Sequence, residues 1–199
     1  MERPVKRAAS ALSFPLLLLL LAACADEELQ ERFDQATDER QLPAHDANAS
    51  DAPGFDGLVK TTDGRLLYEM RDGKKSGSTI GVDPQGRKRV EGDLLDGKQH
   101  GTWTTYHPDG SPMWKGTKRN GLNHGPFVMW YPDGTKKMEG VYKNGKKHGL
   151  SIIRRPDGRK WREERHKLGL PHGIWKEWDE KGNLLRETLY KEGELIPTN

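Results

Sequence analysis

Four histidines that are each followed by glycine recur along the chain at a fixed interval. Histidine is the side chain best suited to metal binding or proton transfer near neutral pH. The step is 24 residues each time, and the pairs are His100-Gly101, His124-Gly125, His148-Gly149 and His172-Gly173. Such a row is either a set of ligands or a turn signal in a repeating fold. The elements around the pairs must decide between the two.

Each 24-residue unit contains two turn signals. One reads Pro-Asp-Gly in three units, at Pro108, Pro132 and Pro156. Proline presets φ for a type I turn and the glycine accepts a left-handed conformation, which together predict a hairpin with a glycine bulge. The other signal is Asn-Gly or Asp-Gly just before the histidine, the strongest short hairpin signal. A shortened copy at Gly64 and Gly73 precedes the full units and is typical of an N-terminal cap.

About seven residues separate consecutive turns, which is the length of a β-strand. Aromatic residues lie three apart in the first strand of a unit, so either a bulge re-aims one ring or both faces carry rings. Glycine in the middle of the second strand, at Gly92, Gly116 and Gly140, predicts that a ring from the first strand lies over it. The fourth unit breaks this pattern with Ser151, Arg154 and Glu164, and we expect it to be the softest.

Composition limits the size of the core. Hydrophobic residues make up 33% of the chain and charged residues 32%, which is too polar for a large closed core. The chain nevertheless has 6 Trp, 5 Tyr and 4 Phe, and most of them recur at fixed positions, which argues against disorder. A short period with recurring rings indicates an open, elongated fold with a thin core.

The pattern G-x-W-x-x-Y-x-P-D-G followed by G-x-Y-K-N-G-K-x-H-G resembles MORN-type repeats, and more closely their bacterial variant. Proteins built of that variant are often labelled YwqK-like antitoxins. The resemblance covers residues 57–195. It implies an all-β fold, namely an elongated single-layer antiparallel β-meander of about five to six 24-residue hairpin repeats. It supplies no catalytic residues.

A stack of such hairpins argues against a metal site at the histidines. Each unit advances by two strands, or about 9–10 Å, whereas zinc needs nitrogen ligands at about 2.0–2.1 Å. No Cys, Asp or Glu recurs beside the histidines at ligand spacing. We therefore expect no metal, and a histidine that hydrogen-bonds the turn backbone just before a glycine. Ser76 replaces it in the first full unit. A metal ladder and contact with a partner are the alternatives.

No motif predicts catalysis. The sequence has no Ser-His-Asp order with a strained elbow, no phosphate-binding glycine loop between strand and helix, and no paired carboxylates in a defined pocket. We expect a protein that is not an enzyme, with no catalytic residue and no cofactor. An enzyme whose site the sequence hides is the alternative. The basic and aromatic mixture also suits single-stranded nucleic acid, but an exported protein would not meet it, so no nucleic acid is expected.

The first residues have the layout of a secretory signal. The positive stretch MERPVKR precedes an apolar run that is too short for a membrane span. Leu21-Ala22-Ala23-Cys24 resembles a bacterial lipobox, in which the thiolate of the cysteine is lipidated and the chain is cut just before it. Cys24 is the only cysteine, as expected for a lipid anchor. Ala23-Cys24-Ala25 also fits an ordinary cleavage site, which would release a soluble protein.

These features predict three parts: a lipoprotein signal peptide over residues 1–23, a lipidated cysteine and acidic flexible tether over 24–55, and a repeat domain over 56–199. Residues 25–55 carry 9 acidic and 2 basic residues, so the repeat domain is basic. Lysine-rich surfaces can serve solubility alone, or they can attract an acidic partner. In lipoproteins of this kind, a residue other than Asp after the cysteine favours the outer membrane.

We therefore expect a non-enzymatic lipoprotein of the bacterial cell envelope, anchored to the membrane by its N-terminal lipid. Its repeat surface would bind an envelope protein or, as second choice, an anionic envelope polymer. The alternative is an antitoxin or immunity-type inhibitor of a cognate toxin. Each ring of the predicted contact surface would also suit core packing against the strand glycines. The predicted contact residues are Trp103, Tyr106, Trp130, Tyr131, Trp175 and Trp178.

Overall fold

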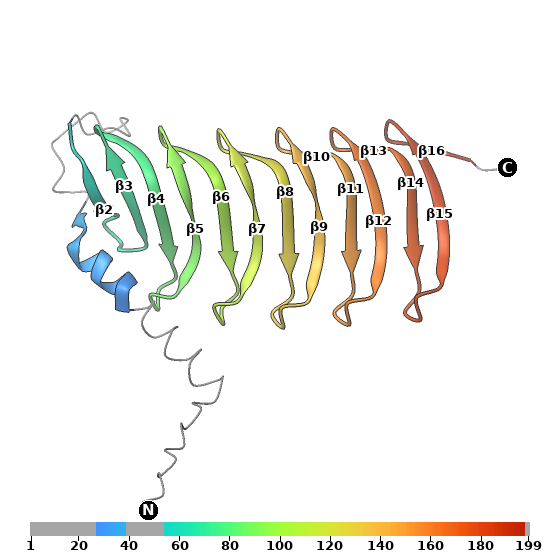
Figure 1. Cartoon of the computed structure of the whole chain (residues 1–199), viewed down its shortest axis with the longest axis horizontal. Coiled ribbons are helices and arrows are strands. Elements are labelled where there is room, and N and C mark those ends of the chain that lie inside the picture. The colour runs from blue at the N-terminus through green and yellow to red at the C-terminus, as the bar shows by residue number, and fades with distance from the viewer. Residues whose placement is uncertain (1–26, 39–53, 198–199) are drawn as a thin grey trace, which may run out of the picture. The chain divides into compact units, whose positions relative to one another are not determined.

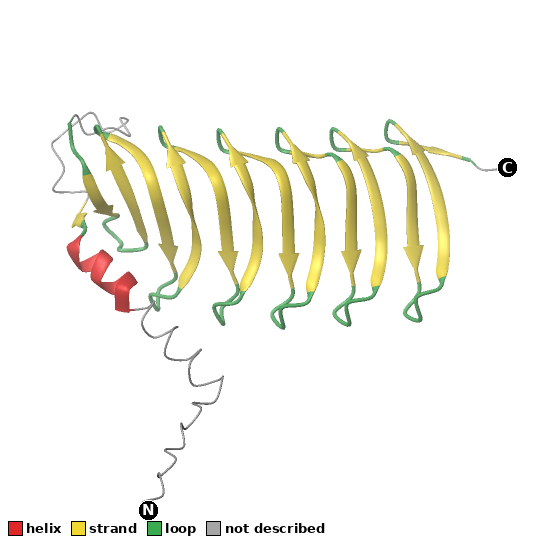
Figure 2. Cartoon of the chain, in the orientation of Figure 1, coloured by secondary structure: helices red, strands yellow, loops and turns green. Residues whose placement is uncertain are grey.

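The computed structural model describes residues 27–38 and 54–197. The chain divides into two compact units, Met1–Gln35 and Ala36–Asn199. Residues 27–35 are helical (Figure 2), so part of the segment predicted as a tether has regular structure. Within the described ranges, no helix is long and apolar enough to cross a membrane. The predicted lipid attachment residue Cys24 and the signal peptide lie outside the described residues.

The second unit is one sheet of sixteen strands, counted over the described residues. The strands are β1 (Thr37–Asp38), β2 (Gly57–Lys60), β3 (Leu66–Arg71), β4 (Lys74–Val82), β5 (Lys88–Leu95), β6 (Lys98–Tyr106), β7 (Pro112–Arg119), β8 (Leu122–Trp130), β9 (Lys136–Lys143), β10 (Lys146–Lys147), β11 (Gly149–Arg154), β12 (Lys160–Lys167), β13 (Leu170–Pro171), β14 (Gly173–Trp178), β15 (Leu184–Lys191) and β16 (Glu194–Ile196).

The strands follow one another across the sheet in chain order (Figure 1). Neighbours from β2 to β16 are antiparallel, and only β1 pairs in parallel, with β2. The short strand β10 pairs with β9, and so does β11, which follows β10 in the chain. In the same way, β13 and then β14 pair with β12. Each strand therefore pairs with strands that are close to it in the sequence. The all-β single-layer meander that the repeat predicted is confirmed.

The Pro-Asp-Gly turns have the predicted geometry. At the turn after β6, the amide of Gly110 donates to the carbonyl of His107 at 3.0 Å, and the His107 amide donates to the Ser111 carbonyl at 2.8 Å. Gly110 has a φ of 83°, which supplies the bulge that lets a type I turn close a hairpin. The Asp109 carboxylate accepts the Ser111 amide at 2.9 Å. Proline, aspartate and glycine thus each have a separate structural reason to be there.

The Asn-Gly turns close two-residue hairpins. Arg119 pairs directly with Leu122, and the two residues between them, Asn120 and Gly121, have φ values of 51° and 82°. Two successive left-handed residues define the type I′ turn, whose twist matches that of the strands. The same position in the fifth unit is Leu168, with a φ of 51°. A leucine side chain disfavours that conformation.

Three of the four recurring histidines hydrogen-bond the next turn of the stack. The amides of Asn144, Leu168 and Glu192 each donate at 3.4 Å to the Nδ1 atom of the histidine 20 residues earlier. Ser76 accepts from Asp96 in the same way at 3.1 Å. Each donor is the left-handed residue that directly precedes a turn glycine. The predicted hydrogen bond to the backbone just before a glycine is therefore present at three histidines, where it links one unit to the next. It is absent at His100, whose Nδ1 atom is buried without a hydrogen-bond partner among the described residues.

Buried side chains are few and lie within the single layer. Val59, Tyr68 and Met70 form a cluster near the shortened first unit, where the sequence predicts a cap. At Gly92 a Cβ atom would lie 2.4 Å from the Trp103 ring, so the predicted cover of that glycine by a ring from the first strand is confirmed.

The other two mid-strand glycines are covered differently. Gly116 lies under Trp114, a ring from its own strand, and a Cβ atom at this position would lie 2.5 Å from the indole and 3.0 Å from Phe127. A Cβ atom at Gly140 would lie 2.6 Å from Ser151 and 3.0 Å from the Phe127 ring. The simple expectation of one first-strand ring over each glycine is therefore incomplete. At Gly116, the indole of Trp114 lies along its own strand and occupies the space that a side chain at this position would need.

Candidate partner-binding surface

The pairing register assigns residues to the two faces of the sheet, because directly paired residues share a face and successive residues alternate. Trp103 pairs with Gly116, and Trp175 pairs with Thr188. We call the face that carries these two tryptophans the ring face. We call the other face, which carries Thr104, the back face.

The six aromatic residues predicted to contact a partner divide between the faces, so they do not form one patch. Trp103 and Trp175 lie on the ring face, and Trp103 is 5% exposed, so it belongs to the core. Tyr106 donates a hydrogen bond to Glu91. Because Glu91 pairs with Thr104, Tyr106 lies on the back face.

The remaining three predicted residues lie toward the Pro-Asp-Gly end of the strands. Trp130 pairs with Lys136, and Trp178 lies under Lys160, whose Nζ atom is 5.4 Å from the ring centroid. Both lysines form ion pairs with the back-face glutamate three residues later. Tyr131 donates its phenol to a backbone carbonyl of the next unit at 2.9 Å. Its oxygen is therefore already engaged within the stack.

The back face carries an ion-pair network around Glu91. Lys88 lies 3.0 Å from Glu91 and its Nζ atom is 4.9 Å from the Tyr106 ring centroid. Burial and the Glu91 carboxylate raise the pKa of Tyr106 above its usual range. Burial alone would raise the pKa of Glu91, but the bonds from Tyr106 and Lys88 outweigh it and lower the pKa. The phenol is thus a fixed donor and the carboxylate a fixed acceptor.

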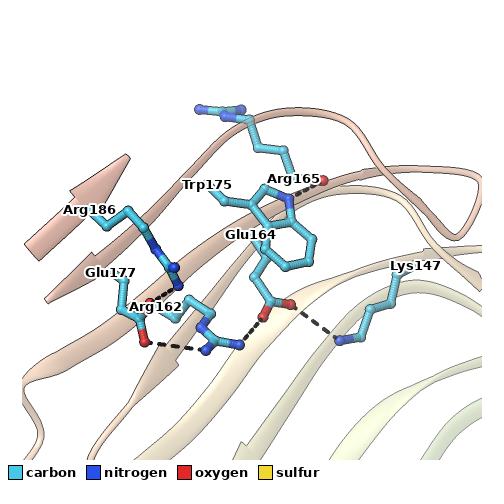
Figure 3. Close-up of polar contacts among 7 residues, drawn as sticks. All are labelled: Lys147, Arg162, Glu164, Arg165, Trp175, Glu177 and Arg186. Carbon is cyan, nitrogen blue, oxygen red and sulfur yellow. Dashed lines mark hydrogen bonds and ion pairs between the residues drawn. The ribbon is translucent and has the colours of Figure 1, made fainter. Parts of the chain in front are cut away.

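The ring face changes character in the fourth unit, where Glu164 contacts Lys147 and Arg162 (Figure 3). Where Phe127 faces Gly140 in the third unit, Ser151 faces Glu164. Both are buried, Ser151 at 1% and Glu164 at 6% exposure. The Glu164 carboxylate lies 3.7 Å from Lys147 and 3.3 Å from Arg162. The Glu164 carboxylate and its ion pairs thus lie on the part of this face where a ring packs in the preceding units.

A ladder of alternating charge continues from this point to the end of the sheet. Glu177 lies between two arginines on the neighbouring strands, 3.4 Å from Arg162 and 2.7 Å from Arg186. Hydrogen bonds from Arg186 and then Arg162 lower the pKa of Glu177 although partial burial opposes them. Arg162 also pairs with Glu164, so it joins the buried carboxylate to the exposed ladder. The side chain of Arg186 is 68% exposed.

Beside the ladder lies an open pocket of about 140 Å³. Trp175 forms its wall, with His166 and Tyr190 on either side at ring-centroid distances of 5.2 Å and 4.9 Å. The indole nitrogen donates to the Arg165 carbonyl at 2.8 Å, which fixes the ring (Figure 3). An engineered cavity of about 150 Å³ holds one benzene molecule, so this pocket suits a single side chain or ring. Its lining residues are Arg162, Trp175, Lys176, Glu177, Arg186, Thr188 and Tyr190.

Sequence reasoning placed Trp175 in the candidate surface but missed the charged residues around it. The signal was present in the alignment of units, because Arg162 and Arg186 stand where earlier units have Val90, Trp114 or Met138. In the described part of the chain, no group of three or more His, Cys, Asp or Glu side chains could hold a metal ion. The arrangement favours noncovalent recognition, with a flat aromatic wall and exposed guanidinium donors.

Comparison with known proteins identifies the repeat. The family model described as MORN repeat variant matches residues 99–113, 123–144 and 171–192. No curated protein matches the chain. Together with the open sheet, these matches indicate a repeat-type protein-interaction module.

One solved structure is weakly similar to this chain. A structure titled "Crystal structure of GtfA/B complex bound to UDP and GlcNAc" is 16% identical to this chain, with a TM-score of 0.25. The alignment covers 77% of this chain and 26% of that chain. A similarity of this size has no bearing on function.

Proposed function

We propose that this protein is a non-enzymatic lipoprotein of the bacterial envelope that binds another protein through the last two units of its repeat sheet. The observation that carries the proposal is the pocket beside Trp175. There an aromatic wall on the ring face lies together with guanidinium groups. Aromatic residues and arginine are the residue types that contribute most to protein interfaces.

The charges of the pocket favour a protein partner over a uniformly anionic polymer. Arg162 and Arg186 are each neutralised in part by Glu177. A lining that mixes acidic and basic groups selects a partner whose own charges are arranged in the complementary order. A polypeptide can carry such an arrangement of both charges. A polymer of like charge would meet the Glu177 carboxylate unfavourably.

Membrane attachment through Cys24 is the second part of the proposal. Two or three acyl chains anchor a protein stably, at about 0.8 kcal/mol for each buried methylene. Labelled palmitate fed to cells should enter the wild-type protein and not the Cys24→Ser variant. Equal labelling of the two would contradict lipidation at this cysteine, and an ordinary cleavable signal peptide would then fit better.

The binding proposal is tested by crosslinking and pull-down of the intact protein from membranes. We expect a specific protein to be recovered, and its recovery to fall with the Trp175→Ala variant. Repeating the capture in 0.5 M salt separates the contributions, because screening weakens exposed charge pairs but not aromatic contacts. Recovery of a toxic protein encoded nearby would instead favour an antitoxin. Recovery of no protein would contradict the proposal.

A further inference from the structure

The outer edge of β15 is only partly paired. β16 covers it at Leu189, Tyr190 and Lys191. Among the described residues, no strand pairs with the outer side of Leu184–Thr188. In the inner units the same stretch is always paired by the first strand of the following unit, as Arg162 is by Glu177. Within the described part of the chain, this stretch of the edge thus has no strand beside it, and an edge of this kind can template an added strand.

One strand of the sheet, β14, shows which sequence pairs well with an edge such as that of β15. β15 carries Arg186-Glu187, which repeats the Arg162-Glu163 of β12 at the same place in the unit. β14 lies between these two strands and pairs with both. Its residues at that level are Lys176 and Glu177.

The contacts of β14 are charge-complementary on both faces. On the ring face, Glu177 pairs with both arginines, as described above. On the back face, Lys176 lies 2.7 Å from Glu187 and is directly paired with Glu163. Opposite charges placed directly across antiparallel strands stabilise the pairing, and like charges destabilise it. A strand beside an Arg-Glu strand is thus favoured when it carries Lys-Glu.

We propose that the free edge of β15 binds an extended segment of a partner protein as an added antiparallel strand. The segment carries a basic residue opposite Glu187, followed directly by an acidic residue opposite Arg186. This inference rests on the proposed function as a protein-binding module and names the chemistry of the segment that is recognised. Addition of a strand to an open edge takes affinity from backbone hydrogen bonds and specificity from the side chains.

Exposure at the edge is consistent with an added strand. The side chains of Arg186 and Glu187 are 68% and 45% exposed, so each retains surface for a second ion pair on its outer side. Leu185 is 63% exposed and Leu184 49%, which supplies apolar contact beside the charged pair. A second copy is a poorer occupant, because a two-fold pairing centred on Arg186 or Glu187 places like charges opposite each other.

The test uses a labelled peptide that copies Gly173–Trp178, GIWKEW, and a control peptide in which Lys and Glu are exchanged. Both have the same composition, so only the charge order differs. Fluorescence anisotropy with the full-length chain should give a preference of about tenfold for the first peptide, since two cross-strand pairs change from opposite to like charge. No binding, or equal binding of the two peptides, would overturn the inference.

A charge-swapped protein provides the matched reversal. In the double variant Arg186→Glu with Glu187→Arg, the control peptide should become the preferred ligand. A double variant that is folded by circular dichroism and keeps the original preference would also overturn the inference. The comparison on the wild-type chain does not depend on whether this variant folds.

Two further readouts separate the outcomes. Light scattering should report a monomer, and a dimer that the double variant dissociates would assign the edge to a second copy and overturn the inference. If the membrane pull-down recovers a partner that the double variant still binds, this edge is not used although the proposed function holds. If the peptides discriminate but no protein is recovered, the proposed function fails instead.

Discussion

Glu164 illustrates how one residue can replace a repeated packing contact. Its carboxylate is buried next to Lys147 and Arg162, and it faces Ser151 where the preceding units place a ring against glycine. The sequence predicts that this unit is the softest, because its polar residues interrupt the ring pattern. The ion pairs give it a different source of order, although removing one partner of a buried pair is costly.

We therefore predict that Glu164→Ala lowers the free energy of unfolding by about 1–3 kcal/mol, because it leaves two partly buried cations without their carboxylate. Urea denaturation measures the change. Glu180→Gln, an exposed substitution at a turn, is the control and should change stability by less than about 0.5 kcal/mol. A Glu164→Ala variant as stable as the control would mean that the pairs contribute nothing.

His166 is the residue at which acid should weaken the sheet. Burial, and then the charge of Lys147, lower the pKa of His166 below its ordinary value, with Glu164 opposing them. The folded protein thus favours neutral imidazole more than the unfolded chain does. A group of this kind stabilises fully above its unfolded pKa of about 6.5 and loses that contribution as pH falls through the folded pKa.

The prediction is that stability falls as the pH drops below about 6.5, by at most about 1.4 kcal/mol per pH unit from this group. His166→Gln should flatten the slope, because glutamine has no proton to gain in this range. Urea titrations of both proteins at several pH values measure the difference. Parallel pH profiles for the two proteins would contradict the role of His166.

At the scale of elements, the turns are the most predictable part of the chain. Pro-Asp-Gly and Asn-Gly act through the conformations of two or three residues, so their geometry is encoded locally. The faces are less predictable, because a bulge shifts the register within each hairpin, as between Thr105 and Tyr106. Sequence alone could not decide which rings share a face. The charged pocket was also missed, because its residues come from three strands.

Leu168 lets us test the turn chemistry directly. It holds a left-handed φ of 51°, the conformation that Asn120 adopts in an earlier unit. We predict that Leu168→Asn raises the free energy of unfolding by about 0.5–1 kcal/mol, because asparagine tolerates this conformation better. The reciprocal change Asn120→Leu should lower it by a similar amount. Thermal or urea unfolding that moves in the same direction for both variants would count against this account of the turn.

At the scale of the whole molecule, a one-layer sheet built from neighbouring hairpins can bind a partner on its two faces or along its edges. Its faces are largely occupied by contacts between units, such as the histidine bonds to the next turn and the rings over glycine. Near β14 and β15, the charged ladder and the pocket lie beside the part of the β15 edge that no described strand pairs. The proposed binding site lies where this pocket and this edge adjoin.

The most direct test of partner binding at this end is photo-crosslinking in intact membranes. A photoreactive amino acid is placed at Leu185, on the β15 edge, or at Leu122, the first residue of β8 in an inner unit. These leucines are comparably exposed, at 63% and 52%, so accessibility alone does not separate them. We predict a discrete protein adduct from position 185 and none from position 122. An adduct only from position 122, or from neither position, would contradict the account.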